Sequence, residues 1–325
     1  MPRPIATYTA SDWLRLRPLT QSYKTWVWNR LDRRHAASPA PDAQAMQRLL
    51  GDLDGKNIIA SIAFNSPWTI AWQLRFVVRH LENVAFLIAD NSNDEAARVK
   101  IAELCTDAGI ACVQLPANPY KDLRYASRSH GLALNWVYHN IVRRLRPAAW
   151  GFFDHDLFPT RPYDPEKRLR GQPFYGEIVS RPGGTYLWPG YSLFSRDADR
   201  DEPLDFRQDW FLGLDTGGMS AALLTGHPDF ASMRFAASRS IGPRRNVAVT
   251  IEDIDWFDDC VHLGNASGWY RSNKEREPAL DLLLQQIYDG VLTAPARGAS
   301  PASAGEGDHA KRGGGGDSTA APWPA

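Results

Sequence analysis

At its centre the chain reads Trp150-Gly151-Phe152-Phe153-Asp154-His155-Asp156-Leu157-Phe158-Pro159. Aromatic residues ahead of the acids favour a buried β-strand, and Pro159 ends the strand because it has no N–H to donate to a sheet. Asp154 and Asp156 therefore fall where the strand ends. Two carboxylates in that place can bind a hard divalent cation, which prefers oxygen ligands. An Asp-rich turn has the same sequence signature, so the neighbouring segments must decide between the two.

The segments before this strand alternate between strands and helices. Apolar runs at 57–64, 84–89 and 110–115 predict strands that are covered on both faces. Apolar residues at helical spacing predict helices at 66–81, at 94–109 and through Leu134, Val137, Ile141 and Leu145. Four strands alternating with three helices predict an α/β fold with a mostly parallel, Rossmann-like central sheet. Helices then cover both faces, because each right-handed crossover lays its helix on the sheet.

Polar residues follow three of these strands. Asn65 comes after the first strand, residues 90–93 after the second, and residues 154–156 after the fourth. In doubly wound sheets ligands bind beyond the carboxyl ends of the strands. These residues are therefore expected to line one site.

Composition limits the class of protein. The 325 residues are 43% hydrophobic, and 37 basic residues balance 37 acidic ones, so no global basic field favours nucleic acid. The three cysteines show no Cys-x-x-Cys spacing, which argues against a disulfide framework or zinc site and favours the reducing cytoplasm. No apolar run is long enough to span a bilayer, and the N-terminus lacks the apolar core of a signal peptide.

From about residue 57 to 270 the chain resembles glycosyltransferases of the GT-A fold, and most closely the large inverting family 2. The resemblance rests on Phe64-Asn65, Asp90-Asn91-Ser92-Asn93-Asp94, Gly131-Leu132-Ala133-Leu134-Asn135 and Phe153-Asp154-His155-Asp156. It implies that Asp90 contacts the nucleotide base, that Asp156 binds Mn²⁺ or Mg²⁺ directly, and that Asp154 contacts the sugar nucleotide or the metal and its water shell. The remaining expected donor contacts are Asn65, Asn91, Asn93, Arg128 and His155.

The resemblance extends to a late histidine. Many GT-A enzymes have a metal-binding His followed by glycines and an aromatic residue, which implies that role for His262 in the segment 261–269. A neutral imidazole beside two carboxylates suits manganese, although a histidine satisfied within a strand is the alternative. Inverting transfer also needs a general base. The first candidate is Asp215, because nearby glycines permit close substrate approach, and Asp209 is the second. Either acid can instead start a turn.

We expect three regions. A helical leader covers 1–55, a GT-A-like domain covers 56–290, and a tail rich in Ala, Gly, Ser and Pro covers 291–325 and is expected to be disordered. Within the domain, 56–160 would bind the nucleotide sugar and 161–290 the acceptor. The second half shows extended segments at 174–180, 185–195 and 247–252, with tight turns at 182–184 and 188–190.

The leader contains Trp and Arg residues between Tyr23 and Arg34. These suit a membrane interface, but packing of a helix on the main domain is the commoner outcome for such a sequence, so we expect at most peripheral membrane contact.

The expected function is a cytoplasmic, metal-dependent, inverting glycosyltransferase. It would move a sugar from a nucleoside-diphosphate sugar, with a UDP-sugar as the first candidate, to a hydroxyl of a glycan, a lipid-linked or a small-molecule acceptor. A sugar nucleotidyltransferase shares the sheet type but needs a basic, Gly-rich phosphate loop, which Asn65-Ser66-Pro67-Trp68 lacks. A catalytically silent carbohydrate-binding or scaffold protein with the same fold is the alternative from another class.

Overall fold

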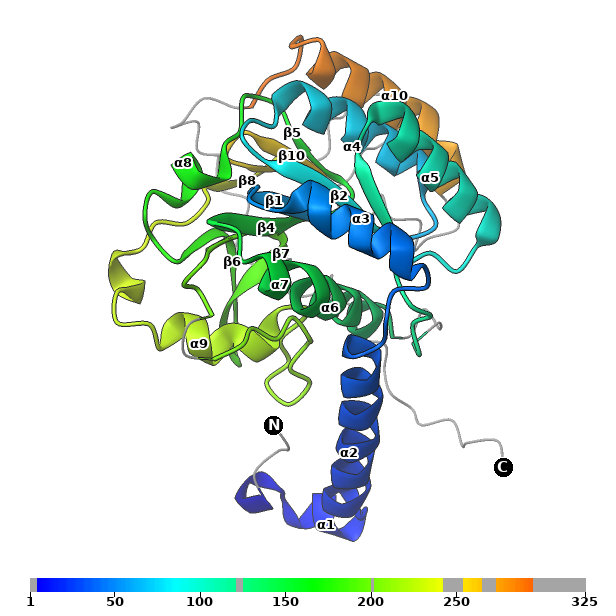
Figure 1. Cartoon of the computed structure of the whole chain (residues 1–325). Coiled ribbons are helices and arrows are strands. Elements are labelled where there is room, and N and C mark those ends of the chain that lie inside the picture. The colour runs from blue at the N-terminus through cyan, green and yellow to red at the C-terminus, as the bar shows by residue number, and fades with distance from the viewer. Residues whose placement is uncertain (1–4, 121–124, 200–201, 242–253, 265–272, 295–325) are drawn as a thin grey trace. The chain divides into compact units, whose positions relative to one another are not determined.

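Figure 1 shows the protein as a computed structural model, which describes residues 5–120, 125–199, 202–241, 254–264 and 273–294. The segment expected to be extended at 247–252 and the tail from 295 lie outside these residues. The helices are α1 (Ala10–Leu14), α2 (Arg17–Ala36), α3 (Ala43–Leu53), α4 (Pro67–His80), α5 (Glu95–Ala108), α6 (Ala126–Val137), α7 (Arg143–Leu145), α8 (Pro165–Leu169), α9 (Ala221–Thr225) and α10 (Asn273–Tyr288). The strands are β1 (Ile58–Ala63), β2 (Ala85–Asp90), β3 (Ala111–Gln114), β4 (Ala149–Phe153), β5 (Leu157–Pro159), β6 (Phe174–Arg181), β7 (Gly184–Ser195), β8 (Ser238–Ile241), β9 (Ile254–Phe257) and β10 (Cys260–Leu263). Short 3₁₀ turns at Ile5–Thr7, Gly218–Ser220 and Phe230–Ser232 and a π turn at Tyr138–Val142 complete the elements.

The central sheet has six strands in the order β3-β2-β1-β4-β7-β6. Its first four strands are parallel, whereas β7 runs antiparallel to β4 and β6 antiparallel to β7. Every residue of β1 is buried, as its continuous apolar run predicts for a strand covered on both faces. The predicted mostly parallel sheet is confirmed.

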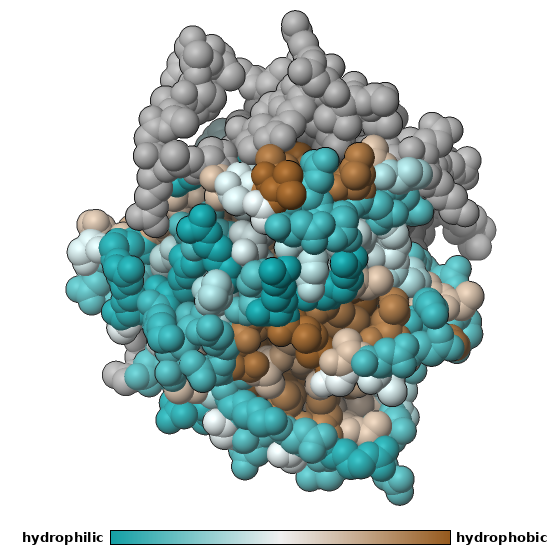
Figure 2. All heavy atoms as spheres, turned by 90° about the horizontal axis from the view of Figure 1, so that it is seen from above, coloured by the Kyte–Doolittle hydropathy of each residue, from teal (hydrophilic) through white to brown (hydrophobic). Residues whose placement is uncertain are grey.

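Helices cover both faces of this sheet. On one face, Leu50 of α3 and Leu134 of α6 belong to the same core as Leu87 of β2. On the other face, Ile70 of α4 and Ile101 of α5 pack with the opposite side of the sheet. The segment expected as a leader therefore ends in a helix, α3, that contributes to the core. Figure 2 shows the molecule from above relative to the view of Figure 1. The coloured surface on this side is largely hydrophilic, with apolar side chains at the floor of a hollow.

The turn predicted at 182–184 joins β6 to β7, but the turn predicted at 188–190 is wrong, because these residues lie inside β7. The pairing of β6 with β7 passes from Ile178↔Leu187 to Gly176↔Ser192, so that residues 188–191 lie opposite Glu177 alone. Such a bulge accommodates a proline, which cannot donate to the ladder. The buried side chains on both sides of the bulge keep the strand in the sheet.

A second, antiparallel sheet has the order β5-β10-β9-β8. Its strand β5 begins directly after the Asp-x-Asp segment, and β9 and β10 form a hairpin in which Phe257 pairs with Cys260. This sheet brings the late part of the chain next to the end of β4. Among the described residues, no helix is both long and apolar enough to cross a membrane.

Candidate metal centre at the carboxyl end of the sheet

Three side chains that could hold a cation meet beyond the end of β4. One ligand atom from each of Asp154, Asp156 and His262 lies within 4.8 Å of the others. His262 Nε2 is 3.2 Å from Asp156 Oδ1, and the two side chains are only 13% and 4% exposed. The structure thus brings together the three residues that the sequence predicted as metal ligands.

Backbone pairing fixes the positions of these groups. The N–H of Asp154 donates to the carbonyl of Gly190, and the buried Gln73 of α4 donates to the carbonyl of Asp154 at 2.7 Å. His262 pairs with Leu157 in the ladder between β10 and β5, and the N–H of Leu263 donates to the carbonyl of Asp156 at 3.0 Å. The register of β10 on β5 therefore places the imidazole of His262 beside the carboxylate of Asp156.

The charges of the cluster are strongly coupled. Burial by itself lowers the pKa of His262, but the charge of the neighbouring Asp156 outweighs burial and raises that pKa to about 10. Burial likewise opposes ionisation of Asp156, yet His262 holds the pKa of this carboxyl below its usual value. Without a cation, a proton on the imidazole balances the buried carboxylate. A metal that binds Nε2 must displace this proton.

The residues present fit a divalent cation. Asp156 Oδ1 is buried and makes no well-aligned hydrogen bond, although it contacts His262. A buried acceptor without a hydrogen bond is costly unless another partner satisfies it. Two carboxylates with one imidazole are donors that Mn²⁺ accepts, and Mg²⁺ could use the two carboxylates.

Two further acids near this cluster escaped the sequence analysis. Asp255 pairs with His262 across the β9–β10 hairpin, and its Oδ2 lies 3.9 Å from His262 Nδ1. Burial first, and then the charges of Asp255 and Asp258, raise the pKa of Glu177 to about 7. The sequence could have indicated Asp255. In a hairpin that turns at Asp258-Asp259, residues at equal distances from the turn face each other, and Asp255 and His262 are such a pair.

His155, between the two acids, has a structural contact. Its Nδ1 lies 3.1 Å from the carbonyl oxygen of Ile62 in β1, and the side chain is only 3% exposed. It therefore ties the end of β4 to the neighbouring strand. Its expected contact with the donor stays a prediction.

The asparagines at the ends of β1 and β2 contact one another. Asn65 has a left-handed backbone with φ of 49°, and its Oδ1 accepts the N–H groups of Asn93 and Asp94. Asn91 Nδ2 donates to Ser129 Oγ, and Asn91 Oδ1 accepts from Asn118. These bonds join the loops after β1, β2 and β3 into one surface at the end of the sheet.

Asp90 is buried in the same place. The carboxylate accepts the N–H of Ser92 at 2.9 Å, and only 3% of the residue is exposed. It lies in register with Ala63 at the end of β1, as the rule for parallel sheets predicts. Its contact with a nucleotide base stays a prediction, as do those of the asparagines.

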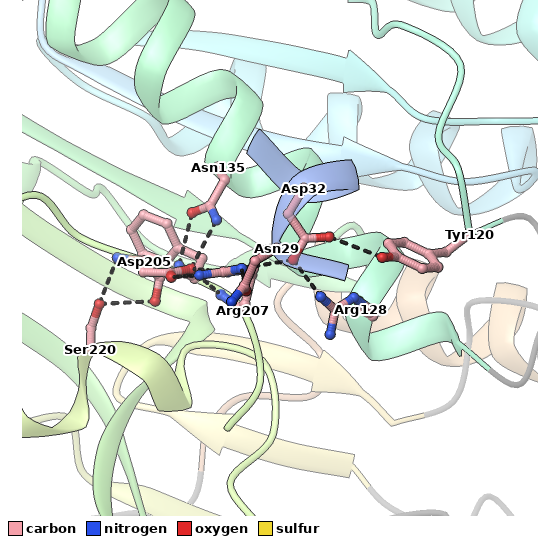
Figure 3. Close-up of polar contacts among 9 residues, drawn as sticks. Asn29, Asp32, Tyr120, Arg128, Asn135, Asp205, Arg207 and Ser220 are labelled. Carbon is pink, nitrogen blue, oxygen red and sulfur yellow. Dashed lines mark hydrogen bonds and ion pairs between the residues drawn. The ribbon is translucent and has the colours of Figure 1, made fainter. Parts of the chain in front are cut away.

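Arg128 belongs to a buried ion cluster between α2 and α6 (Figure 3). It donates to Asp32, which also accepts from Arg207 at 2.7 Å and from Tyr120 at 3.0 Å. Arg207 in turn contacts Asp205. This cluster anchors α2 to the domain, so the contact with phosphate predicted for Arg128 competes with an ion pair already formed.

The two candidate bases differ in their surroundings. Asp209 Oδ1 accepts the N–H groups of Phe211 and Leu212, which is the role of an Asp at the start of a turn. Asp215 is exposed, and its Oδ1 accepts the N–H of Thr216 at 2.8 Å. The structure therefore favours Asp215 as the carboxylate that a substrate can approach.

The glycines near Asp215 have a packing role that the sequence analysis missed. Gly217 has a φ of 91°, and a Cβ atom there would lie 2.8 Å from the carbonyl oxygen of Leu187 and from Pro189. Thr216 Oγ1 donates to the carbonyl of Ser127 near the start of α6. The glycines thus let this loop lie close against β7, next to the bulge that also binds Asp154.

Comparisons with known proteins leave the family open. No protein-family model matches the chain, and no curated protein matches it. Similar solved structures include the crystal structure of S. aureus TarS, at 15% identity and a TM-score of 0.31, where the match covers 46% of this chain and 30% of that one. A structure of S. aureus TarS 1–349 in complex with UDP-GlcNAc matches at 14% identity and a TM-score of 0.31, over 46% of this chain and 48% of that one. The similarity is low and spans less than half of those chains, so it assigns no function to this protein.

Proposed function

We propose that the protein is a metal-dependent glycosyltransferase that moves a sugar from a nucleoside-diphosphate sugar to a hydroxyl acceptor. One observation carries the proposal: Asp154, Asp156 and His262 come together beyond the carboxyl ends of a mostly parallel sheet. That is where α/β sheets bind ligands, and a nucleotide diphosphate is a ligand that needs a cation.

The proposal assigns a separate role to each residue of the site. Asp156 and His262 hold Mn²⁺ or Mg²⁺, and Asp154, which is partly exposed, faces the donor. A bound cation supplies positive charge that stabilises the departing diphosphate. Asp90, at the neighbouring strand end, is the proposed contact to the base, with Asn65, Asn91 and Asn93 shaping the donor site.

The exposed carboxylate of Asp215 is the proposed general base. It takes the proton of the acceptor hydroxyl while that oxygen bonds to the anomeric carbon, opposite the leaving diphosphate, so the configuration inverts. A UDP-sugar is the first donor to test. A glycan, a lipid-linked sugar and a small molecule all remain candidate acceptors, and we propose a cytoplasmic location.

Metal-dependent nucleotide binding tests the proposal. Thermal unfolding would be measured with UDP or GDP, with and without Mn²⁺, for the wild type, for Asp156→Ala and for Asp107→Ala, which removes an exposed acid from α5. A ligand at a hundred times its Kd stabilises a protein by about 2.7 kcal/mol. We expect this stabilisation in the wild type and in Asp107→Ala, and its loss in a folded Asp156→Ala.

Two results would count against the proposal. Equal metal-dependent binding by Asp156→Ala would show that the metal site is misassigned. Absence of stabilisation by either nucleotide would favour the catalytically silent alternative. Hydrolysis of a panel of nucleotide sugars by the wild type would then identify the donor, because many transferases slowly use water as the acceptor.

A further inference from the structure

The N-terminal arm, defined as residues 5–37, exposes an unusual amount of apolar surface. Fifteen large apolar side chains are exposed among the described residues of the whole chain, and eight of them lie in this arm. Isolated exposed apolar side chains are common, but a group of them marks an interaction site. The eight are Ile5, Trp13, Leu14, Leu16, Leu19, Tyr23, Trp26 and Leu31.

Three of these side chains form a stripe on one face of α2. Leu19, Tyr23 and Trp26 follow one another at intervals of four and three residues, which places them on the same side of the helix. Their exposed fractions are 63%, 68% and 57%, and the rings of Tyr23 and Trp26 stack at 6.1 Å. Trp and Tyr are the residues that favour the boundary between water and lipid.

The opposite side of α2 is attached to the domain. Asp32 is buried and joins the ion cluster with Arg128 and Arg207 shown in Figure 3. His35, also buried, has its Nε2 3.4 Å from the carbonyl oxygen of Pro116. Since Tyr23 and Asp32 are nine residues apart, they lie about half a turn from each other around the helix. Because the C-terminal half of α2 is held against the domain through Asp32 and His35, the stripe on the other side of the helix points away from the domain.

The charge of the arm is strongly positive. Its six cations, Arg15, Arg17, Lys24, Arg30, Arg33 and Arg34, are all exposed. Its two acids are both buried, Asp12 against Arg17 and Asp32 in the ion cluster. Six cations less two acids give the arm a formal charge of +4, whereas the whole chain sums to zero.

We propose that the N-terminal arm docks on the surface of a membrane that contains anionic phospholipid. The stripe enters the headgroup region, while the surrounding cations contact lipid phosphates. Arg30 already lies over the ring of Trp26 at 5.8 Å, so its charged end can reach phosphate while its stem covers the aromatic ring.

A second copy of the chain fits this surface less well. The arm has no exposed carboxylate between residues 5 and 37, so two arms facing each other would repel. Among the described residues no helix can cross a bilayer, and the proposal requires only surface attachment. It is independent of the glycosyltransferase proposal, because it needs neither the metal nor a donor.

Co-sedimentation of the full chain with vesicles tests the docking. The vesicles are phosphatidylcholine alone, or equal parts of phosphatidylcholine and phosphatidylglycerol. We expect binding to the anionic vesicles and a loss of about tenfold or more in high salt. The double change Tyr23→Ser and Trp26→Ser should abolish binding, whereas the control Val99→Ser, which removes an exposed apolar side chain from α5, should not.

Charge reversal gives a second, independent measurement. Arg30→Glu with Arg33→Glu should weaken binding to anionic vesicles by about tenfold or more, because each cation near the surface contributes about 1 kcal/mol. Circular dichroism would check that the variants are folded. Absence of vesicle binding by the wild type, or equal binding by folded variants, overturns the proposal. A dimer in size-exclusion chromatography that the Tyr23 and Trp26 changes dissociate would assign the stripe to a second copy instead.

Discussion

Replacing Glu177 by Gln should change how the stability of the protein depends on pH. Glu177 lies in β6 opposite the bulge of β7, and burial together with the charges of Asp255 and Asp258 raises its pKa from 4.5 to about 7. The folded protein therefore holds a proton that the unfolded chain has already released at neutral pH. The protonated carboxyl thus contributes to the stability of the folded state. This contribution is fully present below the unfolded pKa of 4.5 and is lost as the pH rises through the folded pKa of about 7.

The size of the effect follows from the shift. From 4.5 to about 7 is about 2.5 pKa units, which at about 1.36 kcal/mol per unit gives roughly 3 kcal/mol as an upper value. Because the side chain is partly exposed to water, we expect about 2 kcal/mol. The wild type should lose that much unfolding free energy between about pH 5 and about pH 8, relative to a variant that cannot ionise at this position.

Urea unfolding across this pH range measures the difference. Glu177→Gln keeps the shape of the side chain and should remove the pH dependence that belongs to this residue. Glu166→Gln, which changes an exposed acid in α8, should follow the wild type. A pH dependence of Glu177→Gln equal to that of the wild type would refute the reasoning, because the carboxyl would then be ionised at neutral pH in the folded protein.

Two further changes test the site and its support. Asp255→Asn should weaken Mn²⁺ binding by about 10- to 100-fold in titration calorimetry without unfolding the protein, because the carboxylate orients His262, and an unchanged Kd would exclude that role. Asp32→Asn should lower the free energy of unfolding by roughly 3 kcal/mol in urea, because it leaves the buried Arg128 without its carboxylate. Asp107→Asn is the surface control, and equal stability of the two variants would contradict a structural role for the ion cluster.

Much of the fold could be predicted because its signals are local. The strand expected at 57–64 is β1, and the helix expected at 94–109 is α5, which begins after the cap Asp94 and ends at Gly109. A capping side chain and a left-handed glycine act within one turn of the helix. Apolar periodicity likewise indicates which side of an element is buried, so the mostly parallel sheet followed from the sequence.

The turn expected at 188–190 was wrong because a Pro-Gly pair indicates a turn only if nothing else holds the backbone extended. In β7, pairing with β4 and β6 holds the backbone extended, and the bulge opposite Glu177 accommodates the proline. The packing of α2 on the domain also depends on a distant partner, since Arg128 lies nearly a hundred residues after Asp32. Sequence spacing could not indicate that pair.

By itself the sequence determined the alternating strands and helices of the first half, that Asp154 and Asp156 follow a buried strand, and that a late histidine was a candidate partner. Only the tertiary structure decided that His262 lies 3.2 Å from Asp156, with Asp255 beyond it. The physical reason is that strand and helix propensities act over a few neighbouring residues. The approach of Asp156, just before β5, to His262 in β10 depends on sheet register, which is set by hydrogen bonds between segments far apart in the chain.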